Sequence, residues 1–455
     1  MPRPAYPRSP DTGSTGAADS ARSDSDLSLE ERAARQMEES GKLNRYLIGY
    51  GEAVEADWTA RGLEAPDLPT LQRYRVERVR AEMRKADVAG MVLFDPLNVR
   101  YLTDSTNMQV WIMHNAARYA FVATEGPVIL FEYNAFRHLS AHSVAIDEIR
   151  PATGPYFFHA GTRLPEVYRK WSAEIADLID SHGGGNRRLA VDHSAPDGIA
   201  ALQSLNLQVV DAQPIIETAR NIKSAEEIKA MRRSMAACLD ALDDTRAALK
   251  PGMTELELWG AFWNAAVSRG AEWVETCLLA AGPRTNPWFH ECSGYAIQAG
   301  DIVGFDTDLV GPYGYCADIS RTWLCGDDRG DDEQRALYAI AHEQVQYNLE
   351  LLKPGLTFRE FVDKARLLPE DCLPRRYGVL VHGVGLCDEW PAIPYPQDFE
   401  RVGFDGVFEP GMVVCVESYT GRVGGREGVK LEEQAVITET GYDVISVPRP
   451  DPQLS

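Results

Sequence analysis

The amino-acid sequence predicts an α/β domain followed by an α+β domain that is built from two similar halves. Three observations lead to this prediction. The chain has 455 residues, 44% of them apolar, which is enough for two hydrophobic cores. Short apolar runs alternate with helical segments between residues 67 and 218, as in an α/β domain. Between residues 219 and 450, two short motifs occur twice in the same order.

Two segments precede the first predicted domain. Residues 1–27 are rich in Ser, Asp, Gly and Pro and poor in apolar residues, so we expect a disordered tail. Residues 28–66 are compatible with helix but have a narrow apolar face, so we expect a helical extension that docks onto another part of the protein. The apolar side chains of this extension include Leu43, Tyr46, Leu47 and Tyr50.

Residues 67–218 predict the α/β domain. Its first helix begins near Leu71, because Val76, Val79 and Met83 recur at helical spacing. Continuous apolar runs then predict buried strands with helices between them, and this alternation favours a mixed or parallel sheet. The predicted strands are residues 90–94, 120–122, 128–131 and 189–191, and the predicted helices are residues 164–182 and 195–205.

Residues 219–450 predict the second domain, which opens with a capping box at Ser224–Glu227. The motif Lys-Pro-Gly-Met-Thr at 250–254 returns as Lys-Pro-Gly-Leu-Thr at 353–357, each copy between two predicted helices. Residues 300–306 and 411–417 likewise each place an acid six positions after a glycine, at the end of an apolar run. Chance recurrence of common turn motifs is the alternative for either pair alone. Both pairs in the same order indicate two similar halves with a shared site.

Five acidic residues and one histidine in this domain lie at or just after short apolar runs. Carboxylates at the ends of buried strands need a compensating cation. A set rich in oxygen with one imidazole nitrogen suits Fe, Mn, Co or Zn, and it offers enough ligands for two ions. The predicted metal ligands are Asp306, Asp308, Asp318, His382, Glu417 and Glu432.

Residues from about 220 to 445 resemble the pita-bread metallopeptidases, which include methionine aminopeptidase, prolidase and creatinase. The matching motifs are G-F-D-T-D with G-Y-C-A-D-I-S-R-T, then V-H-G-V-G-L, V-E-S and K-L-E-E-Q. The resemblance implies a pita-bread catalytic domain with a binuclear metal centre, preceded by a creatinase-like N-terminal domain that resembles the prolidase and creatinase branch. The family's five ligands match Asp306, Asp318, His382, Glu417 and Glu432.

Two departures from the family pattern bear on function. The hydrolases usually carry glycine two residues after the first ligand, where this chain has Asp308. This acid either adds a ligand or is a solvated residue at a strand end. The hydrolases also carry histidine in a His-Glu-x-Pro motif, where this chain has D-E-W-P, so that Asp388 or Glu389 replaces the imidazole. A carboxylate is a better proton acceptor than an imidazole that orients a peptide, which weakens the peptidase interpretation.

This combination resembles the DddP-type lyases, which cleave dimethylsulfoniopropionate. The resemblance implies a homodimeric carbon–sulfur lyase with a metal pair, iron first and Mn, Co or Zn as alternatives, that releases dimethyl sulfide and acrylate. We expect Asp388 to be the base of a β-elimination, with Glu389 as the alternative. The alternative function is an Xaa-Pro dipeptidase or creatinase-like hydrolase of the same fold. A binding protein that has lost its metal is a third hypothesis, which the complete ligand set disfavours.

The expected substrate is a small zwitterion, whose sulfonium group would prefer aromatic faces, as quaternary ammonium groups do. Tyr377 is the first candidate, followed by Trp390 and, from the N-terminal domain, Trp111; each could instead be a core residue. Trp288 and Phe289 are further aromatic candidates. His290 is expected either to line the substrate site or to orient a ligand. Arg321 is expected to neutralise the acid cluster.

Composition excludes some classes of partner and indicates a compartment. The net charge is −22, from 46 basic and 68 acidic residues, which argues against nucleic acid and anionic membranes as partners. No run of about 18 apolar residues predicts a membrane span, and the polar N-terminus is unlike a signal peptide. The eight cysteines form no C-x-x-C pair, so we expect buried thiols in a cytoplasmic protein.

Overall fold

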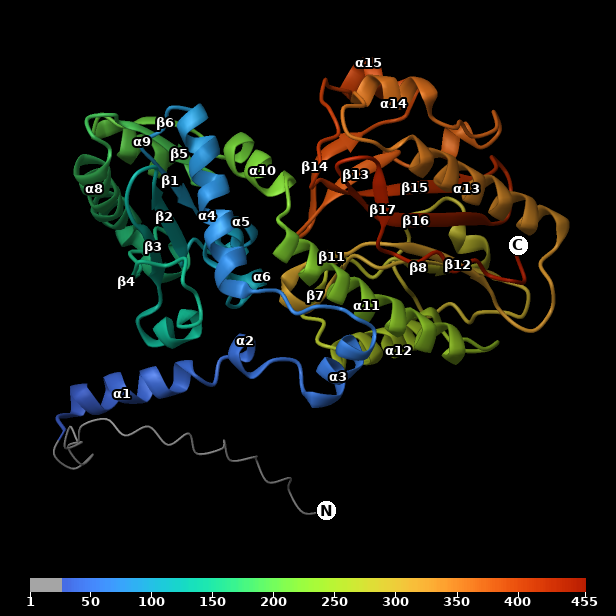
Figure 1. Ribbon diagram of the computed structural model, residues 1–455, viewed down its shortest axis with the longest axis horizontal. Helices are drawn as coiled ribbons and strands as arrows, with labels where there is room; N and C mark the ends of the chain where they lie inside the picture. Colours follow the sequence, from blue (N-terminus) through green and yellow to red (C-terminus); the bar gives the residue numbers. More distant parts are fainter. Residues whose placement is uncertain (1–26) are drawn as a thin grey trace.

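The computed structural model describes residues 27–455, so the predicted tail falls outside the described residues except for its last position. Figure 1 shows two domains side by side, with helix α10 (Gln213–Asn221) between them. None of the helices in the described range has the length and apolar character needed to span a lipid bilayer.

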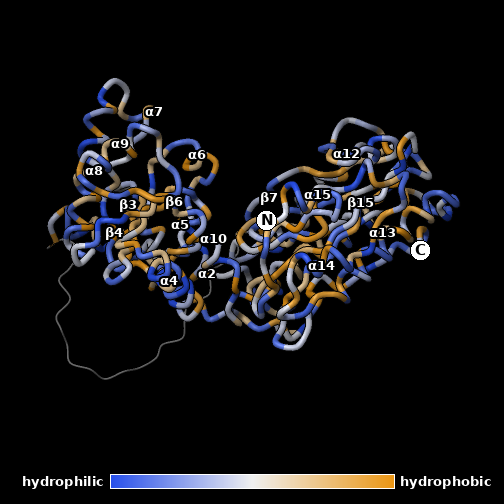
Figure 2. The backbone as a smooth tube through the Cα atoms, turned by 90° about the horizontal axis from the view of Figure 1, so that it is seen from above, coloured by the Kyte–Doolittle hydropathy of each residue, from blue (hydrophilic) through white to orange (hydrophobic). Residues whose placement is uncertain are grey.

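The N-terminal domain is a six-stranded mixed sheet covered by helices. Its strand order is β4-β3-β2-β1-β5-β6, with β1 antiparallel to β2 but parallel to β5. In Figure 2 apolar segments, coloured orange, gather around β3 inside this domain. The strands are β1 (Gly90–Leu93), β2 (Tyr119–Ala123), β3 (Val128–Glu132), β4 (Glu148–Pro151), β5 (Arg188–Val191) and β6 (Gln208–Asp211). The helices are α4 (Leu68–Lys85), α5 (Pro96–Thr103), α6 (Gln109–His114), α7 (Phe157–Ala160), α8 (Leu164–His182) and α9 (Pro196–Ser204).

The second domain repeats one arrangement of helices and strands. Each Lys-Pro-Gly motif follows a long helix and ends at a threonine that begins the next helix with a capping box. Gly252 and Gly355 both adopt positive φ, of 88° and 82°, which explains why glycine is required at each turn. The helices of the first half are α11 (Ala225–Ala248) and α12 (Glu255–Val267), and those of the second half are α13 (Asp332–Leu351), α14 (Phe358–Lys364) and α15 (Pro396–Val402).

The strands of the two halves meet between these helices. One apolar core lies between α11, α12 and the sheet β12-β9-β8, and another lies between α13, α14 and the sheet β14-β13-β15-β16-β17. Strand β16 packs along both β9 and β12, so the two sheets adjoin. The strands are β7 (Trp273–Val274), β8 (Leu279–Ala281), β9 (Ile302–Asp306), β10 (Leu309–Val310), β11 (Cys316–Ala317), β12 (Ser320–Leu324), β13 (Val381–Val384), β14 (Asp388–Ile393), β15 (Val413–Gly421), β16 (Gly428–Ile437) and β17 (Tyr442–Val444).

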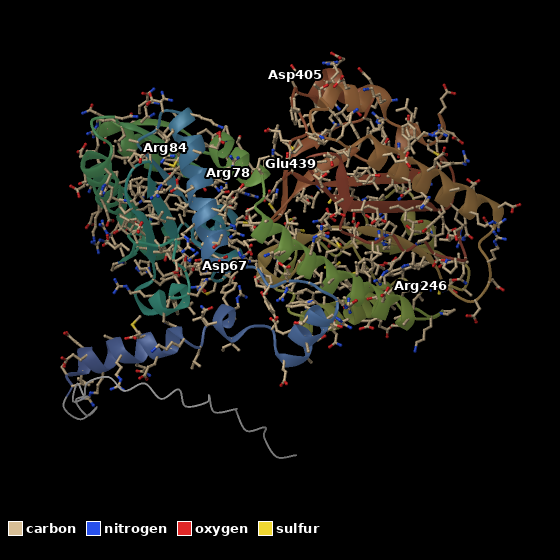
Figure 3. The ribbon with its side chains drawn as sticks, in the orientation of Figure 1. Asp67, Arg78, Arg84, Arg246, Asp405 and Glu439 are labelled. Atoms are coloured by element: carbon tan, nitrogen blue, oxygen red, sulfur yellow. The ribbon has the colours of Figure 1, made fainter. Side chains whose placement is uncertain are left out.

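Helix α10 joins the two domains. On one side Arg78 of α4, labelled in Figure 3, donates hydrogen bonds to the carbonyls of Thr218 and Ala219. On the other side Arg220 donates to Glu389 of β14, 2.9 Å away. The domain that carries β14 is therefore tied to the N-terminal domain next to the predicted site.

The N-terminal extension consists of α1 (Leu29–Gly41), α2 (Arg45–Ile48) and α3 (Glu52–Ala60), and it runs along one side of both domains in Figure 1. Arg100 of the N-terminal domain donates to the Tyr46 hydroxyl at 2.8 Å and to Glu272 of the second domain at 2.7 Å. The Tyr50 hydroxyl accepts a hydrogen bond from the Tyr313 backbone N–H. The extension thus binds to both domains.

Candidate metal centre and active-site cavity

All six predicted ligands line one cavity of about 420 Å³, at the junction of the two halves. Asp306 ends β9, His382 lies on β13, Glu417 on β15 and Glu432 on β16. Glu417 and Glu432 are directly opposite each other in the β15–β16 ladder. Like charges in such cross-strand pairs are destabilising, so this pair requires a cation between or beside the two carboxylates. Asp308 and Asp318 complete the lining from the loops around β10 and β11.

His382 is oriented with one nitrogen toward the acids. Its Nδ1 lies 3.0 Å from the Gly383 carbonyl, so Nδ1 carries the proton and donates. Its Nε2 lies 3.2 Å from Glu432 Oε1 and 3.4 Å from Asp318 Oδ2. A histidine that donates from one ring nitrogen to a backbone carbonyl presents the other nitrogen to a metal in the way that metal sites use.

Ionisation of most carboxyl groups in the cluster is energetically unfavourable, as their pKa values show. Burial raises the pKa of Asp308, Asp318 and Glu417 above the usual range, and repulsion between the neighbouring acids raises it further. Burial alone would also raise the pKa of Glu432, but Lys430 and His382 lower it. A group of buried acids that repel one another is the environment that metal cations stabilise.

Lys430 is the cation at the centre of this cluster, and its side chain is fully buried. Its Nζ lies 2.8 Å from Glu417 Oε2, 3.1 Å from Glu432 Oε2 and 3.3 Å from Asp306 Oδ2. It also donates to Ser320 Oγ at 2.8 Å, and Ser320 in turn lies 2.6 Å from Asp306 Oδ1. Lys430 therefore holds three of the predicted ligands together.

Asp308 adopts a backbone conformation that is unusual for a residue with a side chain. Its φ is 36°, in the left-handed region that favours glycine. The glycine expected at this place from the family resemblance would adopt this conformation without strain. The Asp308 carboxylate accepts a hydrogen bond from Thr276 Oγ1 at 2.8 Å and lines the cavity. A solvated position is excluded, because the residue is 8% exposed.

The donor set fits transition-metal ions. Single ligand atoms from Asp318, His382, Cys415 and Glu432 lie within 4.8 Å of one another, and the same holds for Asp308, Asp318 and Asp388. Glu417 Oε1 is buried and accepts no hydrogen bond from any residue in the described part of the chain. An orphaned carboxylate oxygen beside an imidazole nitrogen and further carboxylates is the arrangement expected where an ion binds.

Asp388 and Glu389 have different surroundings although they are neighbours on β14. The Asp388 side chain is 50% exposed and its Oδ1 lies 3.5 Å from His382 Nδ1. The Glu389 side chain is 2% exposed and is bound by Arg220 and Lys223, each at 2.9 Å. Burial alone would raise the pKa of Glu389, but these two cations lower it to about 2. Burial raises the pKa of Asp388, which favours proton exchange there, whereas Glu389 is held as a permanent anion.

Of the predicted aromatic residues, Tyr377 and Trp390 line the cavity. One face of the Tyr377 ring lies 4.5 Å from Lys430 Nζ, and the Phe289 ring stacks on Tyr377 with centroids 5.5 Å apart. His290 and Trp111 are not among the cavity-lining residues. His290 donates from Nδ1 to the Arg284 carbonyl, and the Trp111 ring contacts Tyr133, Tyr156 and Phe158 in the N-terminal domain.

Several residues of the site were not assigned a role from the sequence. Lys430 could have been found, because it lies two positions before Glu432 on the same strand and therefore shares its face. Arg321 was expected to neutralise the acid cluster. Instead it pairs with Glu433 at 3.0 Å and donates to the Glu432 carbonyl. The ion pairs of Glu389 with Arg220 and Lys223 connect residues far apart in the chain, for which the sequence carries no local signal.

Comparison with known protein families and solved structures defines the class. Residues 75–222 match the Creatinase/Prolidase N-terminal domain, and residues 229–439 match Metallopeptidase family M24. The Xaa-Pro dipeptidase from Bacillus anthracis superposes with a TM-score of 0.67 and 23% identity, over 83% of this chain and 98% of that one. The prolidase from Pyrococcus horikoshii gives 0.65 and 22%, over 83% and 99%. The predicted fold, a creatinase-like domain followed by a pita-bread domain, is confirmed.

Two curated relatives are closer in sequence. Dimethylsulfoniopropionate lyase DddP of Roseovarius nubinhibens is 40% identical over 416 residues, which is 90% of this chain and 93% of the relative. The DddP of Roseobacter denitrificans is 38% identical over 419 residues, with the same coverage. The chain therefore belongs to the M24 metallopeptidase family and, within it, to the group that contains the DddP lyases.

Proposed function

We propose that this chain is a metal-dependent lyase that converts dimethylsulfoniopropionate into dimethyl sulfide and acrylate by base-assisted β-elimination. Two relatives named for this activity share 40% and 38% identity with it over 90% of its length. The observation that carries the proposal is the position of Asp388, a half-exposed carboxylate that opens onto the acid cluster where hydrolases of this fold carry histidine.

The six cavity-lining ligands would hold two transition-metal ions, with iron as the first expectation and Mn, Co or Zn as alternatives. Bound metal ions would supply Lewis-acid polarisation of the substrate carboxylate, which acidifies the adjacent C–H bond. The proposed ligands are Asp306, Asp308, Asp318, His382, Glu417 and Glu432.

The remaining chemistry belongs to side chains of the cavity. Asp388 takes the proton from the carbon next to the substrate carboxylate, the C=C bond forms, and the C–S electron pair leaves with sulfur as a neutral thioether. No acid is needed for this leaving group. Glu389 is unsuited as the base, because both of its oxygens are already bound by cations. Tyr377 and Trp390 line the cavity and are the proposed aromatic contacts of the sulfonium group. Tyr377 would make this contact through its ring edge, because Lys430 and Phe289 cover its faces.

We further propose a cytoplasmic homodimer. The N-terminal domain exposes a contiguous apolar group on α6 and α7, and an exposed apolar patch of this kind supports a subunit interface. Its members and their exposed fractions are Val110 (56%), Met113 (72%), Phe157 (68%) and Phe158 (76%). Trp111 contacts Phe158 of this group and does not line the cavity of its own chain, so we propose that it could reach a substrate only in the site of a second copy. Light scattering on the purified protein tests the dimer. The division into residues 28–66, 67–218 and 219–450 remains our proposal for the domain boundaries.

The test of function is a headspace assay for dimethyl sulfide on purified protein of known metal content, with a Gly-Pro dipeptide assay alongside. Dimethyl sulfide with an equal amount of acrylate and no dipeptide cleavage is the expected result. Dipeptide cleavage without dimethyl sulfide would support the alternative, an Xaa-Pro dipeptidase or creatinase-like hydrolase, which the fold of the solved neighbours favours. If the metal-loaded protein shows neither activity, both the lyase proposal and the hydrolase alternative are excluded.

A further inference from the structure

Cys277 and Cys292 face each other across two antiparallel segments beside the cavity. The bridge between Leu278 and Glu291 sets the register, and in that register the next opposed pair is Cys277 and Cys292. The Cys292 backbone N–H donates to the Cys277 carbonyl at 2.9 Å. Directly opposed residues in such a ladder have Cα atoms about 4.5–5.5 Å apart, within the range of about 4.4–6.8 Å that a disulfide bridges.

The two thiols are also accessible and lie on the same side of the segments. Five of the eight cysteines are buried, whereas Cys277, Cys292 and Cys387 are partly exposed. Both Cys277 and Cys292 pack against the core between α11 and α12, so their side chains share one face. Burial raises the pKa of both thiols, and for Cys292 the neighbouring Cys277, Glu255 and Glu291 contribute. Oxidation is therefore slow at neutral pH and requires a sustained oxidant.

We propose that Cys277 and Cys292 form a reversible disulfide that adjusts the active-site cavity. The oxidant is a small disulfide such as oxidised glutathione. One thiolate attacks it, forming a mixed disulfide and releasing one reduced glutathione. The second thiolate displaces the second glutathione, so that two cysteine thiols lose two protons and two electrons and one glutathione disulfide becomes two thiols.

The proposed disulfide is linked to two of the proposed ligands by the neighbours of Cys277 in the chain. The Thr276 hydroxyl donates to the Asp308 carboxylate at 2.8 Å, and the Leu278 carbonyl accepts from the Asp306 backbone N–H at 2.9 Å. The segment that the disulfide would close carries Phe289, whose ring stacks on Tyr377 in the cavity wall. A bond between the two segments therefore restrains both a pair of proposed ligands and part of the aromatic wall.

The experiment compares the metal-loaded wild type with Cys292→Ser, each incubated with oxidised glutathione, alkylated and mapped by mass spectrometry. We expect a peptide linked through Cys277 and Cys292 in the wild type only. Dimethyl sulfide release should fall by about tenfold in the linked form and recover with reduced glutathione, since small displacements at a reaction centre change rates on that scale. Two further variants, Cys292→Ala and Cys277→Ser, are measured in the same way. Thermal melting of each variant shows whether it is folded, so that a folding defect is not mistaken for loss of the disulfide.

The coupling to activity rests on the proposed lyase function, whereas the cross-link does not. If the reduced wild type is inactive, the lyase function is contradicted. The disulfide is then tested by the mass of the linked peptide alone. An active enzyme whose two cysteines stay alkylatable, or carry glutathione only, would overturn the disulfide. Equal slowing of wild type and Cys292→Ser would overturn the coupling.

Discussion

Asp308 combines a left-handed backbone with a carboxylate in the metal cavity. Because φ is 36° there, replacement by glycine relieves the backbone while removing the carboxylate alone. We predict that Asp308→Gly folds normally but binds less metal per chain than the wild type, measured by elemental analysis after dialysis. Thr276→Val, which removes the hydrogen bond to Asp308 but keeps the carboxylate, is the control for indirect effects. Wild-type metal content in Asp308→Gly would show that this carboxylate is not a ligand.

Asp388 is predicted to act on the substrate and not on the metal. Asp388→Asn keeps the shape of the side chain but cannot accept a proton, so dimethyl sulfide release should fall by about 10²–10⁴-fold while the metal content stays near that of the wild type. Asp405→Asn, at an exposed position labelled in Figure 3, is the matched control and should keep full activity. Unchanged turnover in Asp388→Asn would remove Asp388 from the mechanism.

Lys430 neutralises part of the acid cluster. Removal of one partner from a buried ion pair costs about 3–5 kcal/mol, because the remaining charges are left uncompensated. We predict that metal-free Lys430→Met unfolds with a free energy lower by about that amount, and that saturating metal narrows the difference. Denaturant unfolding with and without a chelator measures both values. An equal loss in the two states would mean that Lys430 stabilises the fold independently of the cluster.

At the scale of elements, Glu389 anchors strand β14 through its ion pairs with Arg220 and Lys223. We predict that Glu389→Gln lowers the free energy of unfolding by about 3–5 kcal/mol at neutral pH, because Arg220 and Lys223 lose their partner. It should also slow turnover, since Asp388 is the adjacent residue. Metal content, measured in the same samples, should stay unchanged; a variant with wild-type stability would contradict this role of Glu389.

The same pair predicts a dependence on pH. The pKa of Glu389 in the folded protein, about 2, lies below that of an unfolded glutamate. Its contribution to stability is therefore complete above the unfolded value and is lost as the pH falls toward 2. Urea unfolding of wild type and Glu389→Gln should give curves that differ at neutral pH and converge in acid. A constant difference down to acid pH would contradict the assignment.

Helices and the buried strands β1, β2, β3 and β5 were predicted well because their signals are local. The predicted helix 164–182 coincides with α8, and the capping box at Ser224 begins α11. Strands β4 and β6 were missed. Each is four residues long with half-exposed or exposed side chains, so neither shows an apolar run. Their place in the sheet depends on pairing with β3 and β5, which no local pattern encodes.

At the scale of the whole molecule, the N-terminal extension fastens the two domains. Trp58 of α3 is 2% exposed, and the Arg233 guanidinium lies 4.6 Å from its ring centroid. We predict that Trp58→Ala lowers the free energy of unfolding by about 3–5 kcal/mol through the cavity it leaves. Leu47→Ala, at a site 55% exposed on α2, should change little. Equal effects of the two variants in denaturant unfolding would contradict a docked extension.

Part of the site was predictable because its signals are local in the sequence, and part was not because the contacting residues are far apart in the chain. The predicted ligands follow apolar strands, and two similar halves imply that those strands meet. The repeated position of the acid, six residues after a glycine, therefore predicted that Asp306 and Glu417 lie in one cavity, as they do. Residues that act through side-chain contact were not predictable, because the partners of Glu389 lie more than 160 positions away. His290, which precedes the first predicted ligands in the chain, and Trp111 of the N-terminal domain do not line the cavity.

The lysine inside the acid cluster also bears on how the protein is made. Glu417 and Glu432 lie on the two strands of one hairpin, and Lys430, two residues from Glu432, gives both carboxylates a cation that belongs to the chain itself. Folding and metal delivery thereby become separate events. A cell short of the required metal could accumulate the finished chain and convert it to the loaded form when the metal returns, so that metal supply and not synthesis would set the timing of activation.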